Sequence, residues 1–414
     1  MKELIFIITF FPSGRRAKKI FTYEILGKLF PHYSLALAKN LYPKRIFLFL
    51  DKKNEPLKEI IKEQFSTFVI ERWEQIFTEI LKDNKSFEEK NFLILRAEYP
   101  LISLPTLKAL IRKHLKDKNF LTILTNNKEI PALVLDGKAL SHLDKAQFKG
   151  RNFEKFLKNL ILFFSEKGER VGEFLSNKKD EFLSLEGRGN FPRIIEALRV
   201  RKIEEFQRKG VKVLDPRTTW IDLDVKIGKG TTIYPFTIIE GETSIGKKCF
   251  IYPFSHIKDC EISDSVNILT SSYLEGAKVM KGASVGPYSR IRPGTVIESK
   301  ARIGNFVEVK NTVVGKRSKA LHLTYLGDAK IGSDVNVGAG TITCNFDGKN
   351  KNTTIIESGA FIGSGTELVA PVKVGKKAYI GAGSTITKDV PPYALGIARE
   401  RQTNIENWVK RRKK

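Results

Sequence analysis

Residues 221–257 read IDLDVKIGKGTTIYPFTIIEGETSIGKKCFIYPFSHI, and an isoleucine stands at every sixth position of this stretch. The isoleucines are Ile221, Ile227, Ile233, Ile239, Ile245, Ile251 and Ile257. An α-helix repeats near 3.6 residues and a strand near two, so neither explains a period of six. A buried aliphatic residue at this period is typical of a parallel β-helix, in which each hexapeptide forms one short side of a prism. The alternative, a sandwich of short strands, needs alternation at period two and no fixed hexad.

The same aliphatic ladder continues beyond residue 257. Its further members are Ile262, Ile268, Leu274, Val279, Val285, Ile291, Ile297, Ile303, Ile356, Ile362, Leu368, Val374, Ile380 and Ile386. Two breaks, at 303–337 and 337–356, are expected to be loops, and loops that leave a rigid scaffold often carry function. The first break contains HLTYLGDA and the second contains GAGTITCNFDGKNK. We predict a β-helix over residues 219–390 that Pro391 and Pro392 end, followed by a C-terminal segment with a basic tail at 391–414.

Residues 1–190 alternate apolar, strand-like runs with amphipathic stretches. Strands are expected at 4–11, 45–50, 67–70, 92–95 and 120–124, and helices at 33–41, 56–64 and 104–115. This alternation predicts an α/β domain with a mainly parallel sheet, whose ligands lie at the carboxyl ends of the strands. Residues 191–218 are expected to form a linker, with a helix over 191–209 and a lead-in to the first coil.

Composition points to a soluble globular protein that handles anionic small molecules. The 414 residues suffice for two or three domains, and 41% are hydrophobic. The net charge of +26 is spread over both halves of the chain, which argues against a dedicated nucleic-acid arm. A diffuse positive field would favour phosphates or coenzymes. The alternative, a general enrichment in lysine, explains most of the excess positive charge.

The chain is expected to be cytoplasmic and free of membranes. The start, MKELIFIITFFPSG, resembles a short signal peptide, but a basic run at 15–19 follows it and no small-residue cleavage site does. We interpret it as a buried first strand. No apolar stretch approaches the length of a membrane span. The cysteines, Cys249, Cys260 and Cys344, have no metal-ligand spacing and are too few for a disulfide framework.

The most specific signal lies in stretches around the two breaks. They are GPYSRIRPGTVIESKARIGNFVEVK (286–310), SKALHLTYLGDAKIGSDVNVGAGTITCNFDGKNKNTTI (318–355), GSGTELVAPV (363–372) and GAGSTITKDV (381–390). They closely resemble the bacterial bifunctional enzyme that makes UDP-N-acetylglucosamine, specifically its glucosamine-1-phosphate N-acetyltransferase half. Over residues 211–414 the resemblance implies a left-handed β-helix that works as a homotrimer with acetyl-CoA. Hexapeptide repeats alone would indicate only an acyltransferase.

The resemblance implies which residues catalyse. His322 matches the general base of that family. A neutral imidazole can take the proton from an attacking amine. Without the motif around it, a single histidine is more often structural. Glu308 matches a residue that orients the base or supports it electrostatically.

The resemblance also implies the binding residues. Arg292, Lys310 and Lys351 match residues that hold the sugar phosphate, Tyr325, Asn336 and Asn345 match residues that contact the sugar, and Ala339, Ser364, Ala382 and Arg399 match the coenzyme A side. Cations around a phosphate make chemical sense, because charge-assisted hydrogen bonds are strong. Any one lysine in this basic chain would otherwise be a solvated surface residue. Phe346 stands where the family usually has tyrosine, so we expect a hydrogen bond to be lost and stacking to be kept.

The N-terminal half resembles the nucleotidyltransferase-like, Rossmann-like uridyltransferase domain of the same family, but its motifs depart from the pattern. The family's glycine loop, LAAGxGTRM, reads TFFPSGRRA here, and Pro12 removes an amide donor from a loop that cradles phosphates. The resemblance implies a Mg²⁺ site at Glu98, where the family has aspartate, and at Asn190. We therefore predict that uridyltransferase activity is lost.

Three alternatives stay open. In the first, the chain retains both activities, with Lys18, Lys19 and Glu98 replacing the missing groups. In the second, it acylates another amino sugar phosphate or nucleotide. In the third, the N-terminal domain is only a scaffold or a partner-binding module. The phosphate-binding cations favour a sugar 1-phosphate as the substrate.

Overall fold

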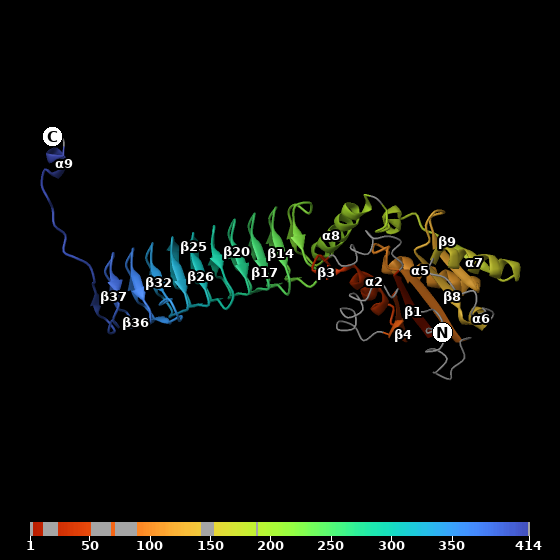
Figure 1. Cartoon of the computed structure of the whole chain (residues 1–414), viewed down its shortest axis with the longest axis horizontal. Helices are drawn as coiled ribbons and strands as arrows, with labels where there is room; N and C mark the ends of the chain where they lie inside the picture. The colour runs from red at the N-terminus through yellow and green to blue at the C-terminus, as the bar shows by residue number, and fades with distance from the viewer. Residues whose placement is uncertain are drawn as a thin grey trace. The chain divides into compact units, whose positions relative to one another are not determined.

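The computed structural model describes residues 3–10, 24–50, 68–70, 89–141, 153–187 and 189–412. The chain divides into two compact units, Met1–Arg199 and Val200–Lys414 (Figure 1). The division falls inside α8 (Asn190–Arg208), the helix expected at 191–209. The predicted combination of an α/β unit and a left-handed parallel β-helix is confirmed. Within the described residues no helix has the length and apolarity needed to cross a membrane.

The N-terminal unit contains a seven-stranded sheet in the order β5-β4-β1-β6-β8-β7-β9. The strands are β1 (Glu3–Phe10), β4 (Arg45–Leu50), β5 (Phe68–Ile70), β6 (Lys90–Arg96), β7 (Leu121–Thr125), β8 (Ala132–Asp136) and β9 (Val171–Leu175). Only β8 runs antiparallel to its neighbours, so the sheet is mainly parallel as predicted. The first apolar run is β1, which is buried because parallel strands flank it on both sides. β8 and β9 were not predicted.

Helices and short elements complete this unit. They are α2 (Phe30–Lys39), α5 (Leu104–Asp117), α6 (Gly137–Ser141), α7 (Phe153–Glu166), the 3-10 turn η4 (Lys179–Phe182) and the hairpin strands β2 (Glu24–Ile25) and β3 (Lys28–Leu29). The helices expected at 33–41 and 104–115 are confirmed as α2 and α5. α5 begins where the Ser103 side chain accepts a hydrogen bond from the Thr106 amide. The helix expected at 56–64 lies outside the described residues.

The C-terminal unit is a prism of three parallel sheets, to which each coil contributes one strand per sheet (Figure 1). The first sheet has β10 (Lys212–Val213), β13 (Thr232–Ile233), β16 (Phe250–Ile251), β19 (Asn267–Ile268), β22 (Ser284–Val285), β25 (Arg302–Asn305), β28 (Lys319–His322), β31 (Asn336–Val337), β34 (Phe361–Ile362), β37 (Tyr379–Ile380) and β39 (Leu395–Gly396). The second has β11 (Trp220–Ile221), β14 (Ile238–Glu240), β17 (His256–Lys258), β20 (Tyr273–Glu275), β23 (Arg290–Ile291), β26 (Glu308–Lys310), β29 (Tyr325–Gly327), β32 (Ile342–Cys344), β35 (Glu367–Val369) and β38 (Thr385–Ile386). The third has β12 (Lys226–Ile227), β15 (Ser244–Ile245), β18 (Glu261–Ile262), β21 (Lys278–Val279), β24 (Val296–Ile297), β27 (Val313–Val314), β30 (Ala329–Ile331), β33 (Thr354–Ile356) and β36 (Val372–Val374). A short helix, α9 (Trp408–Arg411), lies in the C-terminal segment.

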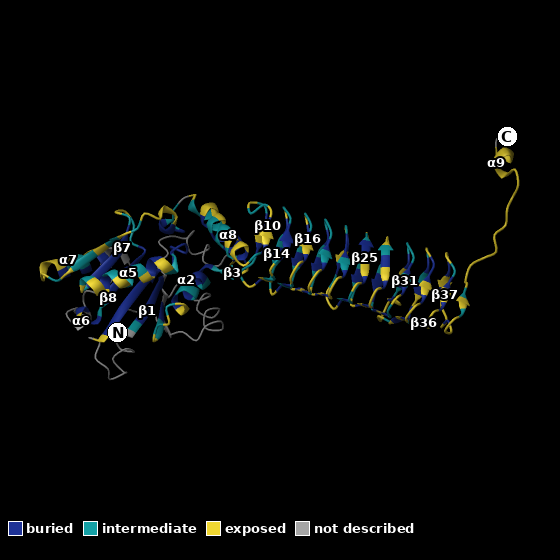
Figure 2. Ribbon diagram, turned by 180° about the vertical axis from the view of Figure 1, so that it is seen from behind, coloured by how far each residue is buried: buried dark blue, intermediate teal, exposed yellow. Residues whose placement is uncertain are grey.

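The isoleucine ladder forms the core of the prism. Partners in register stack inside each sheet, for example Ile233 on Ile251 and Ile239 on Ile257, and all four are fully buried (Figure 2). Each coil therefore buries one aliphatic residue per sheet while its neighbours in sequence face outward. Burying such a side chain stabilises the fold by about 1.5–3 kcal/mol, so the ladder strongly favours one register for the stacked coils.

The expected break at 303–337 is wrong. Strands β26 to β31 run through it, and their core positions are Val309, Val314, Ala320, Leu326 and Ile331. The steps there are again five or six residues long, but alanine, a small side chain, fills the core position at 320. The second break, at 337–356, is confirmed in part: β32 runs through its first half with Thr343 buried, and between β32 and β33 the chain leaves the prism in a loop closed by a bridge between Phe346 and Lys351.

The parallel stack reaches beyond residues 219–390 at both ends. β10 pairs with β13 before the first isoleucine of the ladder. β39 pairs with β37 after Pro391 and Pro392, so these prolines turn the chain without ending the first sheet.

Candidate functional site

His322 lies at the end of β28 in the first sheet, not in a loop as expected from the sequence. β25 and β28 have four residues each, whereas the other strands of this sheet have two. The longer pairing brings Asn305 into register with His322, and the imidazole Nδ1 lies 2.8 Å from the Asn305 Oδ1. The ring itself is exposed. An exposed imidazole is therefore held by a neighbour that sequence reasoning did not identify.

A glycine allows this close approach of the two strands. A Cβ at Gly304 would collide with the carbonyl of Leu321, so only glycine fits here. One residue on, the Leu323 amide donates to the Asn305 carbonyl at 3.1 Å. The backbones on which Asn305 and His322 stand are thus fixed to each other.

Glu308, the predicted support of the base, has a different partner. It lies on β26 in the second sheet, and its Oε1 is 3.0 Å from Nη1 of Arg292. The ring of His322 is bonded to Asn305. Glu308 therefore holds the guanidinium of Arg292, while Asn305 orients the imidazole.

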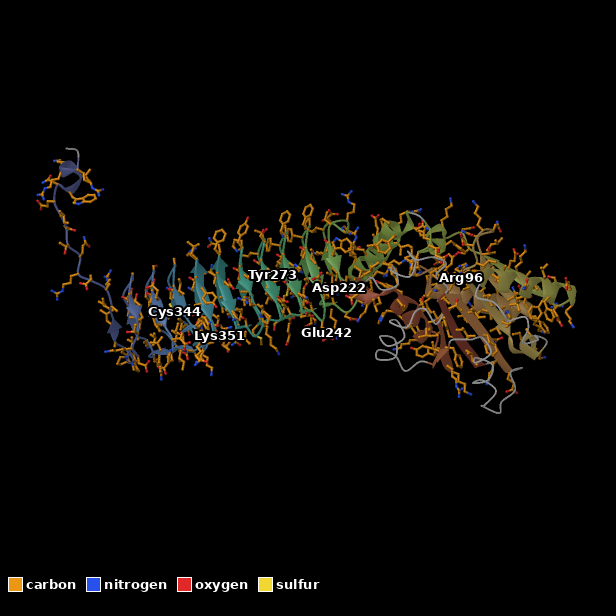
Figure 3. The ribbon with its side chains drawn as sticks, viewed as in Figure 1. Arg96, Asp222, Glu242, Tyr273, Cys344 and Lys351 are labelled. Atoms are coloured by element: carbon orange, nitrogen blue, oxygen red, sulfur yellow. The ribbon has the colours of Figure 1, made fainter. Side chains whose placement is uncertain are left out.

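The three predicted phosphate-binding cations come together. Arg292 and Lys310 occupy neighbouring coils of the second sheet, where the Arg292 amide donates to the Val309 carbonyl. Lys351, which Figure 3 labels beside the prism, lies in the loop between β32 and β33 and is adjacent to Lys310. The adjacent ammonium of Lys351 lowers the pKa of Lys310, and the positive charge of Arg292 acts in the same direction. Crowded cations repel one another, so a bound dianion would relieve this repulsion.

Asp328 completes the cation cluster, and the sequence analysis did not single it out. Its carboxylate accepts hydrogen bonds from the Asn311 Nδ2, at 2.6 Å, and from the Asn345 Nδ2. Partial burial raises the pKa of Asp328, but these two donors and the lysines outweigh burial and hold it below its ordinary value. The carboxylate therefore stays ionised and anchors the loop through Asn345. The sequence signal that could have identified Asp328 is its place in the HLTYLGDA stretch.

The two predicted sugar contacts Tyr325 and Asn345 meet above a glycine. A Cβ at Gly327 would collide with the Tyr325 hydroxyl and would lie 2.8 Å from the Asn345 Nδ2. Phe346 follows Asn345 and is exposed. Asn336, the third predicted sugar contact, lies apart from this group on β31 of the first sheet, in register with Lys319.

The small residues predicted for the coenzyme side form one column along the prism. Ala339, Ser364 and Ala382 each stand two residues after the buried residue of their strand in the first sheet, as does His322. Backbone bonds tie successive coils at this corner, from the Gly365 amide to Ala339 and from the Gly383 amide to Ser364. Coils stack about 4.8 Å apart, so the column runs about 14 Å from the imidazole to its last alanine.

Arg399 lies in the segment that follows the last coil of this column. The amide of the preceding Ala398 donates to the Ser384 Oγ at 3.2 Å, which fixes the chain at the last coil. The guanidinium is exposed. All four residues predicted for the coenzyme side therefore follow one corner of the prism.

The predicted Mg²⁺ ligands do not form a metal site among the described residues. The side chain of Glu98 is fully buried, with one carboxylate oxygen 3.8 Å from the Arg96 guanidinium. Asn190 donates its side-chain amide to the Ser184 carbonyl at 2.9 Å. No group of three or more histidine, cysteine or acidic side chains is placed to hold a metal in the part of the chain that the structure describes. Residues Gly14, Arg16, Lys18 and Lys19 of the altered glycine loop lie outside that part.

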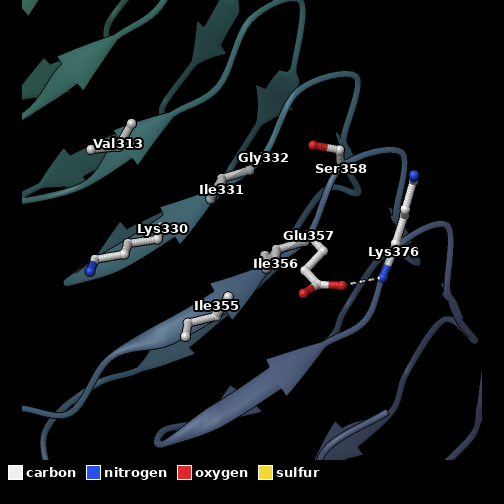
Figure 4. Close-up of a pocket in the computed structure, with 9 residues that line it drawn as sticks. All are labelled: Val313, Lys330, Ile331, Gly332, Ile355, Ile356, Glu357, Ser358 and Lys376. Carbon is white, nitrogen blue, oxygen red and sulfur yellow. Dashed lines mark hydrogen bonds between the residues drawn. The ribbon is translucent and has the colours of Figure 1, made fainter. Parts of the chain in front are cut away.

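A separate groove of about 600 Å³ lies on the third sheet (Figure 4). Val313 and Ile355 line it, with Lys330 between them, and Glu357 accepts a hydrogen bond from the Lys376 amide at its rim. None of the predicted site residues lines it.

We expect Lys310→Ala to raise KM for a sugar phosphate about tenfold or more, with kcat little changed. A hydrogen bond to a charged group contributes about 1.5–3 kcal/mol, and this bond is present in both ground and transition states. Initial rates at varied substrate concentration measure the effect. Lys278→Ala, which removes an exposed lysine paired with Glu261 on the third sheet, is the control. Equal KM values in the two variants would contradict a phosphate site at the cluster.

Comparisons with known proteins show the family to which the chain is related. A family model described as "Bacterial transferase hexapeptide (six repeats)" matches residues 353–388. Three relatives carry the name "Bifunctional protein GlmU". The relative from Thermosipho africanus is 42% identical over 94% of this chain and 93% of its own. The relative from Thermotoga maritima is 40% identical over 78% and 79%, and that from Caldicellulosiruptor saccharolyticus is 35% identical over 100% and 98%.

The chain belongs to the GlmU family. The alignments span both units, so membership covers the N-terminal unit as well as the prism. The predicted resemblance and the predicted class, a hexapeptide-repeat transferase, are confirmed.

Proposed function

We propose that this chain transfers the acetyl group of acetyl-CoA to the amine of glucosamine-1-phosphate, making N-acetylglucosamine-1-phosphate for UDP-N-acetylglucosamine biosynthesis. One observation carries the proposal: the same prism bears an exposed imidazole bonded to Asn305, a column of small residues that follows it along one corner, and a cluster of three cations on the second sheet and its loop. A base, an anion site and a track for an extended chain are the parts that such a reaction needs. The expected location is the cytoplasm.

In the proposed reaction the substrate amine attacks the thioester carbonyl. Nε2 of His322 takes a proton from the amine as the C–N bond forms, and the C–S bond then breaks to release the coenzyme thiol. Arg292, Lys310 and Lys351 bind the sugar phosphate and position the amine. Tyr325, Asn336 and Asn345 are the proposed contacts for the sugar.

The column of small residues is proposed to hold the pantetheine arm. That arm is about four peptide units long, which at roughly 3.5 Å each gives about 14 Å. The distance agrees with the length of the column from His322 to Ala382. Arg399, at the end of the column, would bind a phosphate of the coenzyme.

We also propose that the chain is a homotrimer, as the resemblance implies. The corner that carries His322 bears exposed apolar side chains on its earlier coils: Phe236, Phe254, Tyr288, Phe306 and Leu323 are 51–63% exposed. Phe236 stacks on Phe254 at 5.0 Å and Tyr288 on Phe306 at 5.4 Å. A straight apolar stripe along a prism is best covered by a parallel prism, and closed three-fold symmetry repeats the same patch on every copy.

The backbone at this stripe supports the same proposal. These five residues have φ between 46° and 60°, a left-handed conformation that costs a non-glycine residue roughly 1–2 kcal/mol. The other two corners fill most of their left-handed positions with glycine or polar residues, such as Lys248, Asn311 and Asp334, and Tyr393 is the exception. The large apolar side chains at this one corner are therefore not required by the turn itself.

Phe254→Asp is expected to convert the trimer into a monomer of 46.9 kDa. Placing a charge in an apolar interface leaves it buried and unpaired, which costs several kcal/mol. Light scattering measures the mass. Tyr42→Asp, at an exposed aromatic residue of the N-terminal unit, should leave the mass unchanged. A stable monomer in the unmodified protein, or a trimeric Phe254 variant, would contradict the proposal.

The N-terminal unit leaves two proposals. The altered glycine loop predicts that uridyltransferase activity is lost. The name of the relatives, "Bifunctional protein", does not support that loss and favours the alternative, in which the chain also transfers UMP from UTP to N-acetylglucosamine-1-phosphate. The buried carboxylate of Glu98 lies 3.8 Å from the Arg96 guanidinium, which does not favour a Mg²⁺ ion at this residue.

Two assays on the purified chain test these proposals. The first measures thiol release from acetyl-CoA with glucosamine-1-phosphate, and absence of activity would overturn the proposed function. The second measures pyrophosphate release from UTP with N-acetylglucosamine-1-phosphate and Mg²⁺. Turnover near one per second or faster, within the usual range of roughly 1–10³ s⁻¹, would establish the bifunctional alternative.

A further inference from the structure

We infer that Asn305 is a positioning residue that selects the tautomer of His322. The inference rests on the proposed function and adds to it a residue that neither the motif nor the comparisons assign. A neutral imidazole carries its proton on one nitrogen and offers a lone pair on the other. The hydrogen bond at one nitrogen therefore decides whether the other can act as a base.

The contact favours one tautomer. The Asn305 Oδ1 lies 2.8 Å from the imidazole Nδ1, and an amide oxygen can only accept. Nδ1 must then carry the proton and donate it to Oδ1. The lone pair is left on Nε2, the nitrogen at the far side of the exposed ring, where an amine can reach it. With the opposite tautomer, Nε2 would carry a proton and His322 could not accept another from the substrate.

The fold itself does not require an amide side chain at this position. In the preceding coil the equivalent position is Pro287, and in the coil after His322 it is Ala339. The backbone link between the coils is made by the Asn305 carbonyl and the Leu323 amide, independently of the side chain. The amide of Asn305 is therefore explained by its contact with the imidazole.

The expected effect is moderate. A neutral hydrogen bond contributes about 1 kcal/mol, which corresponds to about a fivefold change in the ratio of the tautomers. Asn305→Ala should lower kcat about two- to fivefold and leave KM for both substrates nearly unchanged. The loss is much smaller than that expected for removing the base, because the base remains and only its population of the active tautomer falls.

Asn305→Asp separates positioning from structure. A carboxylate still accepts from Nδ1, so the tautomer is kept. Its negative charge also favours the protonated ring, which cannot act as a base, so the acid limb of the pH–rate profile should move to higher pH by about one unit. Above that limb the aspartate variant should recover the kcat of the unmodified protein, whereas the alanine variant should not.

The deciding experiment is ¹⁵N NMR of the full chain with ¹⁵N-labelled histidine. His322→Gln identifies the signals of the ring, and nitrogen shifts distinguish protonated from unprotonated nitrogens. The unmodified and Asn305→Asp proteins should show protonated Nδ1 and free Nε2, and Asn305→Ala should shift toward protonated Nε2. Asn267→Ala, which removes an asparagine from β19 of the same sheet, should change neither the spectrum nor kcat.

An unchanged tautomer in Asn305→Ala, or an unchanged kcat in that variant, overturns the inference. Because the spectrum is recorded without substrates, it tests the positioning role even if the assay shows no acetyl transfer. Failure of the proposed function and failure of this inference are thus observed separately.

Discussion

Replacing His322 by alanine is expected to lower kcat for acetyl transfer roughly 10²–10⁴-fold, the usual contribution of a general base. The ring is exposed and its hydrogen bond to Asn305 lies at the surface, so the variant should fold normally. KM for the sugar phosphate should change little, because the cation cluster on the second sheet is untouched. Thiol release under saturating substrates measures the effect.

His256→Ala is the matched control. This half-exposed histidine lies on β17 of the second sheet, and its Nε2 is 2.8 Å from the Glu240 carboxylate. It therefore resembles a base paired with an acid more closely than His322 does, yet no cation cluster or small-residue column adjoins it. Full activity in the His256 variant with loss in the His322 variant supports the assignment. Equal rates for His322→Ala and the unmodified protein would contradict it.

The prism could be predicted because its rule is local and repeated. Each coil needs one aliphatic residue per sheet, so the period of six shows directly in the sequence. The ladder was missed between Ile303 and Val337, where Ala320 places a small side chain at a core position. In the N-terminal unit β9 was missed because its residues are only partly buried and show no strong apolar run.

The site could be predicted only in part, for a different physical reason. The motif located His322 and the three cations, because these residues lie in recognisable stretches. The partners Asn305 and Asp328 were missed because they act across coils: Asn305 lies 17 residues before the imidazole, and Asp328 lies 17 residues before Asn345. Seventeen residues are one coil of this prism, a spacing that acquires meaning only when the coils are stacked. The contact of Glu308 with Arg292 also joins neighbouring coils, and its predicted support of the base stays a prediction.

Ala382→Trp is expected to raise KM for acetyl-CoA at least about 100-fold. Ala382 is exposed at the end of the small-residue column, so an indole there would fill the space proposed for the pantetheine arm without disturbing the core. A 100-fold loss corresponds to about 2.8 kcal/mol, which is modest for excluding an extended chain from a site about 14 Å long. The KM for glucosamine-1-phosphate should stay unchanged, because the cations lie on the second sheet. Initial rates with each substrate varied in turn measure both constants.

Lys388→Trp is the control, because it adds the same indole at an exposed position of the same coil, away from the column. Thermal unfolding should be nearly unchanged in both variants, since surface substitutions usually alter stability by about 0.5 kcal/mol or less. Light scattering on both establishes that any loss of affinity does not come from a changed subunit number. If Ala382→Trp bound acetyl-CoA as tightly as Lys388→Trp, the coenzyme would have to lie elsewhere. The column of small residues that follows His322 would then result only from the close stacking of the coils, with no role in binding.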